Sequence, residues 1–168
     1  METALLGAGV GAPRRADRLR CAARWTAAAL LAWAAGGKLI LWGAFGQMLT
    51  ALGLSRAELV PWAQAGVPAA ELAIALLLAL RLAPVLAAFA LLLLSLLFAG
   101  VHGFALVSGE AIPCGCLGVA LSHASWARHA QLLAVCALLA ACALVLLFAP
   151  TAPSPRQRSA DDSPAPGV

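Results

Sequence analysis

The feature that most constrains this chain is a series of four long apolar segments, which cover residues 25–42, 62–82, 84–106 and 130–149. Each provides about the 17–25 residues that an α-helix needs to cross about 30 Å of hydrocarbon. Open strands cannot satisfy their backbone hydrogen bonds in lipid. Only 11% of the 168 residues are charged, whereas soluble domains have about 25%. The sequence therefore predicts an all-α fold, an integral membrane four-helix bundle embedded in the lipid bilayer.

The distribution of cationic residues predicts the orientation of this bundle. With the N-terminus inside, the cytoplasmic segments hold eight of them, namely Arg14, Arg15, Arg18, Arg20, Arg24, Arg81, Arg156 and Arg158. The outer loops hold only Arg56 and Arg128. Because cytoplasmic loops of membrane proteins carry the excess of Lys and Arg, we expect a multi-pass protein of the plasma (inner) membrane. Both termini are then cytoplasmic, and the loop between the third and fourth segments is extracytoplasmic.

Three regions follow from the same pattern. Residues 1–20 form a basic cytoplasmic N-terminal segment, which we expect to be poorly ordered, and residues 21–149 form the four-helix transmembrane domain. Residues 150–168 contain five prolines, a composition typical of a disordered cytoplasmic tail. The basic run borders an apolar segment, so it indicates contact with anionic lipid and no nucleic-acid partner. A cleaved signal peptide is the alternative for the first segment, but the apolar stretch continues beyond the Ala-Trp-Ala at 32–34 that resembles a cleavage site.

Two ionisable residues lie inside the predicted spans, where such residues are costly and usually paired or functional. Lys38 lies about 20 Å along the first helix from Trp25, and Glu71 lies about 13 Å below Trp62. Both depths fall in the outer half of the bilayer and agree within the reach of a lysine side chain. We expect a Lys38–Glu71 ion pair, or two groups that line one cavity. A snorkelling lysine and a purely structural glutamate are the alternatives.

Cysteine residues provide the clearest chemical signal. Cys114 and Cys116 are separated by Gly115 in a loop that also contains Pro113, and this loop is predicted on the side where disulfides are permitted. A disulfide across so short a separation is strained, and strained exposed disulfides exchange readily. A structural bond that closes so small a ring also adds little stability. The motif therefore favours a catalytic dithiol–disulfide pair over a structural bond.

Other arrangements of these residues remain open. His102 and His123 flank the loop, but the second thiol pair that marks most zinc sites is absent, so we predict no metal. A further alternative is that Cys114 and Cys116 have no chemical role. Cys136 and Cys142 are too far apart on one helix to bridge each other and resemble core residues. Cys136, about 12 Å below the surface, is the one candidate resolving thiol, whereas Cys21 is an incidental thiol or a lipidation site.

The chain resembles the methylamine utilisation (MauE) branch of the DoxX-like membrane proteins, across about residues 25–148. The motifs that carry the resemblance are Gly36-Gly37-Lys38-Leu39, Pro68-Ala69-Ala70-Glu71-Leu72, Ser108-Gly109, Cys114-Gly115-Cys116-Leu117-Gly118 and Ser125-Trp126-Ala127-Arg128. The family usually has Phe at position 117 and commonly Asn at position 129. It shares a four-helix plan with thiol oxidoreductases of the vitamin K epoxide reductase and DsbB type.

This resemblance implies a membrane thiol–disulfide redox component in the maturation of a secreted disulfide-rich protein, such as the small subunit of methylamine dehydrogenase. A periplasmic thioredoxin-like protein is the implied partner. The motifs establish no cofactor, and a membrane quinone is a candidate electron acceptor. Arg128 or a protonated His123 would tune the thiols, because nearby positive charge favours the thiolate. The alternatives are a non-enzymatic assembly factor whose cysteines are structural, and a small transporter that uses Lys38 and Glu71.

Overall fold

The structure, a computed structural model, describes residues 12–53, 56, 58–108 and 126–149. These residues form helices and no strand. In chain order the helices are α1 (Ala12–Ile40), α2 (Trp42–Ala51), α3 (Leu59–Leu80), α4 (Pro84–Ser108) and α5 (Trp126–Phe148). The all-helical fold predicted from the sequence is confirmed. The second and fourth predicted segments differ from α3 and α5 by a few residues at their ends.

Helices α3, α4 and α5 are each long and apolar enough to cross a membrane, whereas the fourth span is a bent pair formed by α1 and α2. Large apolar side chains on all of these helices face outward, including Trp33, Leu76, Leu97 and Phe148, each more than half exposed. Soluble proteins rarely expose apolar surface on this scale. The molecule is therefore a membrane protein whose outer surface faces lipid.

Helix α1 begins earlier than the sequence analysis predicts. The expectation of poor order up to residue 20 is wrong from Ala12 onward, because the helix already includes this part of the basic segment. Alanine and arginine are among the strongest helix formers, and Pro13 suits a first helical turn. The arginines thus extend the helix beyond the apolar stretch.

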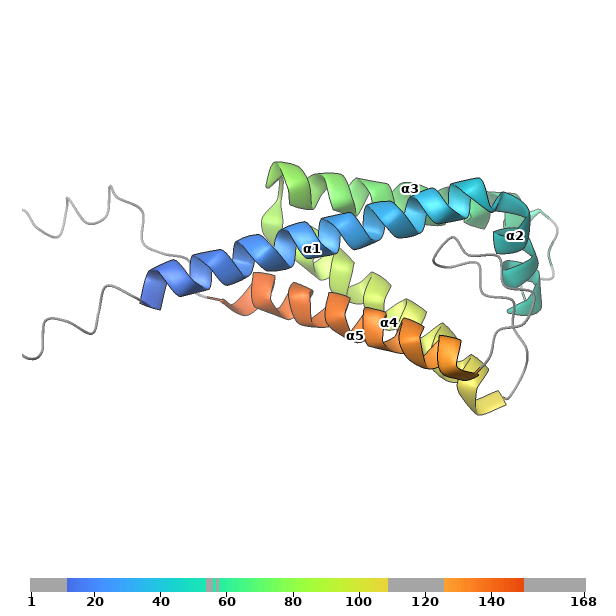
Figure 1. Ribbon diagram of the computed structural model, residues 1–168. Coiled ribbons are helices and arrows are strands. Elements are labelled where there is room, and N and C mark those ends of the chain that lie inside the picture. Colours follow the sequence, from blue (N-terminus) through green and yellow to red (C-terminus); the bar gives the residue numbers. More distant parts are fainter. Residues whose placement is uncertain (1–11, 54–55, 57, 109–125, 150–168) are drawn as a thin grey trace, which may run out of the picture.

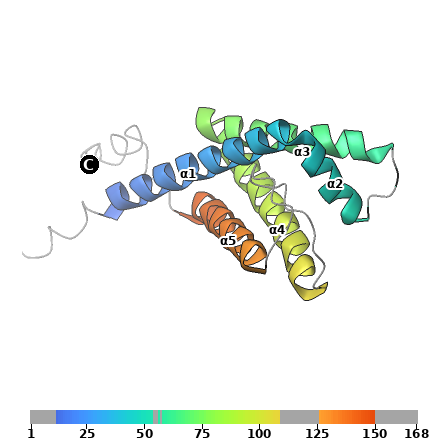
Figure 2. The ribbon, with the colours of Figure 1, turned by 45° about the vertical axis from the view of Figure 1, so that its right-hand side comes forward.

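The helices form two closely packed pairs, α1 with α3 and α4 with α5, with weaker contacts from α1 to α5 and from α3 to α4. In Figures 1 and 2 the pairs lie close together at the start of α1 and diverge toward α2. Arg20 near the start of α1 donates a hydrogen bond to the carbonyl oxygen of Ala149. Both described ends of the chain therefore lie at one end of the bundle, as the topology predicted from charge requires.

The core between the pairs is built largely from small residues. Ala27, Ala35, Ala87, Ala88 and Ala143 are all fully buried. In lipid the association of helices depends on close van der Waals packing and on polar contacts, and small residues allow the backbones to approach. The alanine content of the sequence thus contributes directly to the packing of the bundle.

Helix α2 was not predicted. It leaves α1 at Leu41 with a bend of 94° and lies across the end of the bundle (Figure 1). Two backbone hydrogen bonds span the bend, in which Leu41 N donates to Gly37 O and Phe45 N donates to Leu41 O. Gln64 of α3 fixes the bend, since its side-chain nitrogen donates to Trp42 O at 2.8 Å.

We expect Gly46→Ala to loosen this contact. A methyl group at Gly46 would overlap the Gln64 amide nitrogen, so the Gln64–Trp42 hydrogen bond would have to break, at a cost of about 1 kcal/mol. The matched control is Gly43→Ala on the same helix, where the added methyl meets nothing within 4 Å. Thermal unfolding in detergent should show a lower Tm for Gly46→Ala than for Gly43→Ala. Equal Tm values would mean that Gln64 does not hold α2.

Candidate functional site

The structure brings Lys38 and Glu71 together inside the bundle. Lys38 Nζ donates to Glu71 Oε1 at 2.7 Å, and each side chain is only 1% exposed. Lys38 comes from the last turn of α1, where the helix dipole favours a positive charge. Glu71 comes from the middle of α3, the helix that packs most closely on α1. The sequence placed Lys38 and Glu71 at similar depths in the membrane, and the structure shows that the two side chains are in direct contact.

Two aromatic rings cover the lysine ammonium group. The Nζ atom lies 5.1 Å from the ring centre of Phe98 on α4 and 5.8 Å from that of Phe45 on α2. Both distances are within the range of cation–π attraction, which is strongest where the cation is shielded from water. The charge therefore has an anionic partner and aromatic partners, contributed by α2, α3 and α4. Side chains from α2, α3 and α4 therefore all contact the ammonium group of Lys38 on α1.

A small cavity of about 40 Å³ adjoins the pair, and its lining includes Ser95, His102 and Cys136. Glu71 Oε2 is buried and has no hydrogen-bond partner among the described residues. Ser95 donates its hydroxyl hydrogen to Leu91 O at 2.7 Å, so its oxygen still accepts. A polar cavity needs only about 10–15 Å³ to hold a water molecule. The volume can hold one water molecule, and Glu71 and Ser95 contribute acceptor oxygens to a lining that is otherwise mostly apolar.

Two histidines connect α4 and α5 next to this cavity. His102 and His129 are both buried, and their Nδ1 atoms are 3.4 Å apart. A hydrogen bond between these atoms requires one ring to be protonated at Nδ1 and the other to accept there. Which ring donates depends on the tautomers that the two histidines hold. Together with Lys38, Glu71 and the cavity, the histidines form what we call the buried polar cluster.

The remaining predicted site residues fall into two groups, those outside the described residues and those away from the buried polar cluster. Cys114, Cys116 and His123 fall outside the described residues, in the segment that joins the end of α4 to the start of α5. Arg128 is exposed near the start of α5. Cys142 packs in the apolar core among the other helices, away from the cavity that Cys136 lines. Within the described ranges, no three His, Cys, Asp or Glu residues are grouped so that they could hold a metal ion.

Sequence reasoning missed the contact between His102 and His129, and it also missed Ser95 and the two phenylalanines. One signal was present for the histidines. His102 precedes the end of α4 by less than two turns, and His129 follows the start of α5 by about one turn. Residues so placed on consecutive antiparallel helices lie at similar depth. The aromatic cover of Lys38 depends on the bend into α2 and had no comparable signal.

The comparison with known families gives one match, to methylamine utilisation protein MauE, over residues 16–149. The matched region contains all five helices except the first turn of α1. It includes the buried polar cluster and the segment with Cys114 and Cys116. No curated protein and no solved structure matches the chain significantly.

Proposed function

Because the chain belongs to the MauE family, which indicates a role in methylamine utilisation, we propose that it is a membrane thiol–disulfide exchange component that assists maturation of a secreted disulfide-rich protein. Cys114 and Cys116 are the proposed exchanging pair. The observation that carries the proposal is the buried polar cluster, because it puts proton-handling groups beside the Cys136 thiol. The two histidines of the cluster lie near the end of α4 and the start of α5, which the segment with Cys114 and Cys116 connects.

The proposed reaction starts when a thiolate of the reduced client attacks the Cys114–Cys116 disulfide, because the thiolate is the attacking species. That disulfide breaks and a mixed disulfide forms. The second client thiolate then attacks the mixed disulfide, which releases the oxidised client and leaves Cys114 and Cys116 as a dithiol. Two electrons pass to the pair, and the two protons that the client thiols lose are taken up by the departing thiolates.

The oxidant that restores the pair is, by chemical class, the disulfide of a periplasmic thioredoxin-like partner, through the same exchange in reverse. A membrane quinone is the other proposed acceptor. A cavity of about 640 Å³ between α2, α3 and α4 includes Phe45 and Phe98 in its lining. All its lining side chains are apolar, so it suits an isoprenoid tail but offers no donor to quinone oxygens. This cavity therefore does not provide a binding site for a quinone head group.

We further propose that the protein lies in the plasma (inner) membrane with the Cys114–Cys116 segment outside the cytoplasm. The excess of cationic residues near the start of α1 and at Arg81 supports this orientation. The proposed clients and partners are then secreted proteins, since the exchange would occur on their side of the membrane. Arg128, exposed near the start of α5, and His123 are the proposed groups that would favour the thiolate form.

Cys136 is the proposed resolving thiol, and its substitution tests whether the buried polar cluster takes part in exchange. In this role a Cys136 thiolate attacks the loop-cysteine sulfur of the mixed disulfide, which releases the client thiolate and leaves a disulfide between Cys136 and that loop cysteine. We therefore expect Cys136→Ala to prolong the mixed disulfide between this chain and its client. Acid-quenched samples on non-reducing gels would measure this lifetime. The matched control is Cys142→Ala, which removes a buried thiol from the same helix in the apolar core. Equal lifetimes in both variants would overturn the role of Cys136.

One observation favours the assembly-factor alternative. The Lys38–Glu71 pair is almost completely buried, as a pair that only fixes helix packing would be. In that interpretation the cysteines are structural and the protein scaffolds a membrane complex. The assembly-factor function and the exchange function are distinguished by measuring both stability and client maturation on the same variants of Lys38 and Glu71.

A further inference from the structure

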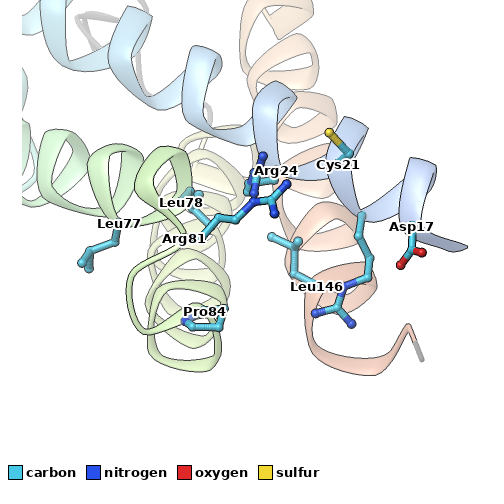
Figure 3. A pocket seen from close by; sticks show the side chains of 9 residues that line it. Asp17, Cys21, Arg24, Leu77, Leu78, Arg81, Pro84 and Leu146 are labelled. Atoms are coloured by element: carbon cyan, nitrogen blue, oxygen red, sulfur yellow. The ribbon is translucent and has the colours of Figure 1, made fainter. Parts of the chain in front are cut away.

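A second polar site lies at the opposite end of the bundle, where α1 begins and α3 ends. A pocket of about 360 Å³ opens there between α1, α3, α4 and α5. Figure 3 shows the side chains around it, with Arg24 and Arg81 close together and the leucines beside them. Arg20, Arg24 and Arg81 line the pocket together with one acidic residue, Asp17. Three guanidinium groups and one carboxylate give the lining a net charge of +2.

Arg24 indicates that this pocket takes a ligand. Its side chain is only partly exposed, and its Nε atom is buried without a hydrogen-bond partner among the described residues. Burying such a donor without a partner is unfavourable. The guanidinium group also lies 5.4 Å from the ring centre of Trp25, but this contact provides no hydrogen-bond acceptor for the Nε–H. Because the Nε atom is buried, a small turn of the Arg24 side chain is needed to bring this donor to an acceptor inside the pocket, and that contact would remove the cost.

Arg81 provides a second, independent observation. It ends α3 in the left-handed conformation, with φ of 58°, and Leu82 N and Arg81 N donate to the carbonyl oxygens of Leu77 and Leu78. Glycine is the usual residue at this position of a helix end, because other residues are strained there. Ala83 in the same turn also has a positive φ, of 42°, so the strain belongs to the turn. The observation that supports the site is that the Arg81 guanidinium group lines the pocket from the end of α3.

The ligand must be anionic at one end and apolar at the other. Guanidinium groups match phosphate oxygens through paired hydrogen bonds. Leu77, Leu78 and Leu146 line the same pocket and suit acyl chains. Trp25, more than half exposed next to Arg24, is typical of a membrane–water interface. Basic pockets between transmembrane helices bind anionic lipid headgroups.

We propose that this pocket binds the phosphate of an anionic phospholipid, with Arg24 and Arg81 holding the headgroup and the leucines contacting the acyl chains. A phosphatidylcholine carries the same phosphate, but its quaternary ammonium group faces a net positive lining. The site is therefore selective for lipids with a net negative headgroup. The proposal does not depend on thiol–disulfide exchange, because none of its residues belongs to the buried polar cluster.

The test uses the purified full chain in detergent micelles, titrated separately with dioleoylphosphatidylglycerol, dioleoylphosphatidylcholine and inorganic phosphate. Ligands that bind the folded state raise the Tm, so we expect the phosphatidylglycerol to raise it most. Arg81→Gly should weaken the apparent affinity for this lipid about tenfold, the loss of one charge-assisted contact. The lipid-free Tm of this variant should not fall, because glycine suits the left-handed position.

The control is Arg18→Gln, which removes a cation from the same end of α1 without touching the pocket lining. It should keep the full response to phosphatidylglycerol, whereas Arg24→Gln should weaken the apparent affinity as Arg81→Gly does. Equal responses to both lipids, or equal losses in Arg18→Gln and Arg81→Gly, would show general charge attraction and overturn the site. A matching response to inorganic phosphate alone would assign the pocket to a free anion and overturn the lipid.

Discussion

Glu71→Gln is expected to lower the free energy of unfolding by about 3–5 kcal/mol, because removing one partner of a buried ion pair leaves the other charge uncompensated. The structure gives the reasons for a large effect. The Lys38–Glu71 distance is 2.7 Å and both side chains are 1% exposed, so bulk solvent does not reach the pair to replace the lost carboxylate. Glutamine keeps the shape of the side chain, and the change in charge is therefore isolated.

Thermal or denaturant unfolding in detergent measures this effect, and the chain offers a matched control. Glu58 immediately precedes α3 and is exposed, so Glu58→Gln should change the free energy of unfolding by less than about 0.5 kcal/mol. A loss below about 1 kcal/mol for Glu71→Gln would contradict a buried pair, since exposed ion pairs have effects of that size.

The double variant Lys38→Met/Glu71→Leu separates the effect of the ion pair on stability from its effect on client maturation. Replacing both partners of a buried pair by apolar residues is often neutral or stabilising, so we expect it to recover most of the lost stability. If the pair takes part in exchange, this folded variant still fails to support client maturation. Full maturation by the folded double variant would show that the pair only fixes helix packing, as the assembly-factor alternative requires.

The second large effect concerns the loop cysteines. Cys114→Ser and Cys116→Ser should each reduce disulfide formation in the client to the level seen without the protein. A serine hydroxyl forms no disulfide, so neither variant can complete the exchange. The measurement is the amount of oxidised client, for example the small subunit of methylamine dehydrogenase, in cells that lack their own copy of this protein.

Cys142→Ser is the control for these variants, because Cys142 is buried in the apolar core and has no proposed role. It should keep client maturation near the level of the unaltered chain. If both loop variants support maturation and Cys142→Ser does not, the assignment of the exchanging pair is wrong. If all three support maturation, the assembly-factor alternative holds.

The fold and part of the site could be predicted because membrane burial is strongly reflected in sequence. Apolar segments of fixed length indicated the spans, and a rise of about 1.5 Å per residue was enough to bring Lys38 and Glu71 to one level. Cys136 was expected at the level of Glu71, and it lines the same cavity. In each case the prediction depended only on depth along a straight helix.

The features that escaped prediction depend on contacts between helices. The bend into α2 involves the Gln64–Trp42 hydrogen bond, whose partners are far apart in the sequence. Phe45 reaches Lys38 only because of that bend. The early start of α1 is different, since the alanines and arginines after Ala12 favour a helix and the sequence already contained this signal.

The most direct test of the central claim is the redox state of Cys114 and Cys116 in intact cells. A membrane-impermeant, mass-shifting maleimide is applied from outside, before and after mild reduction, to a chain with Cys21, Cys136 and Cys142 replaced by serine. We expect both cysteines to be labelled only after reduction, as an exposed exchangeable disulfide requires. Labelling of both without reduction, or of neither after reduction, would contradict a resting disulfide on the extracytoplasmic side.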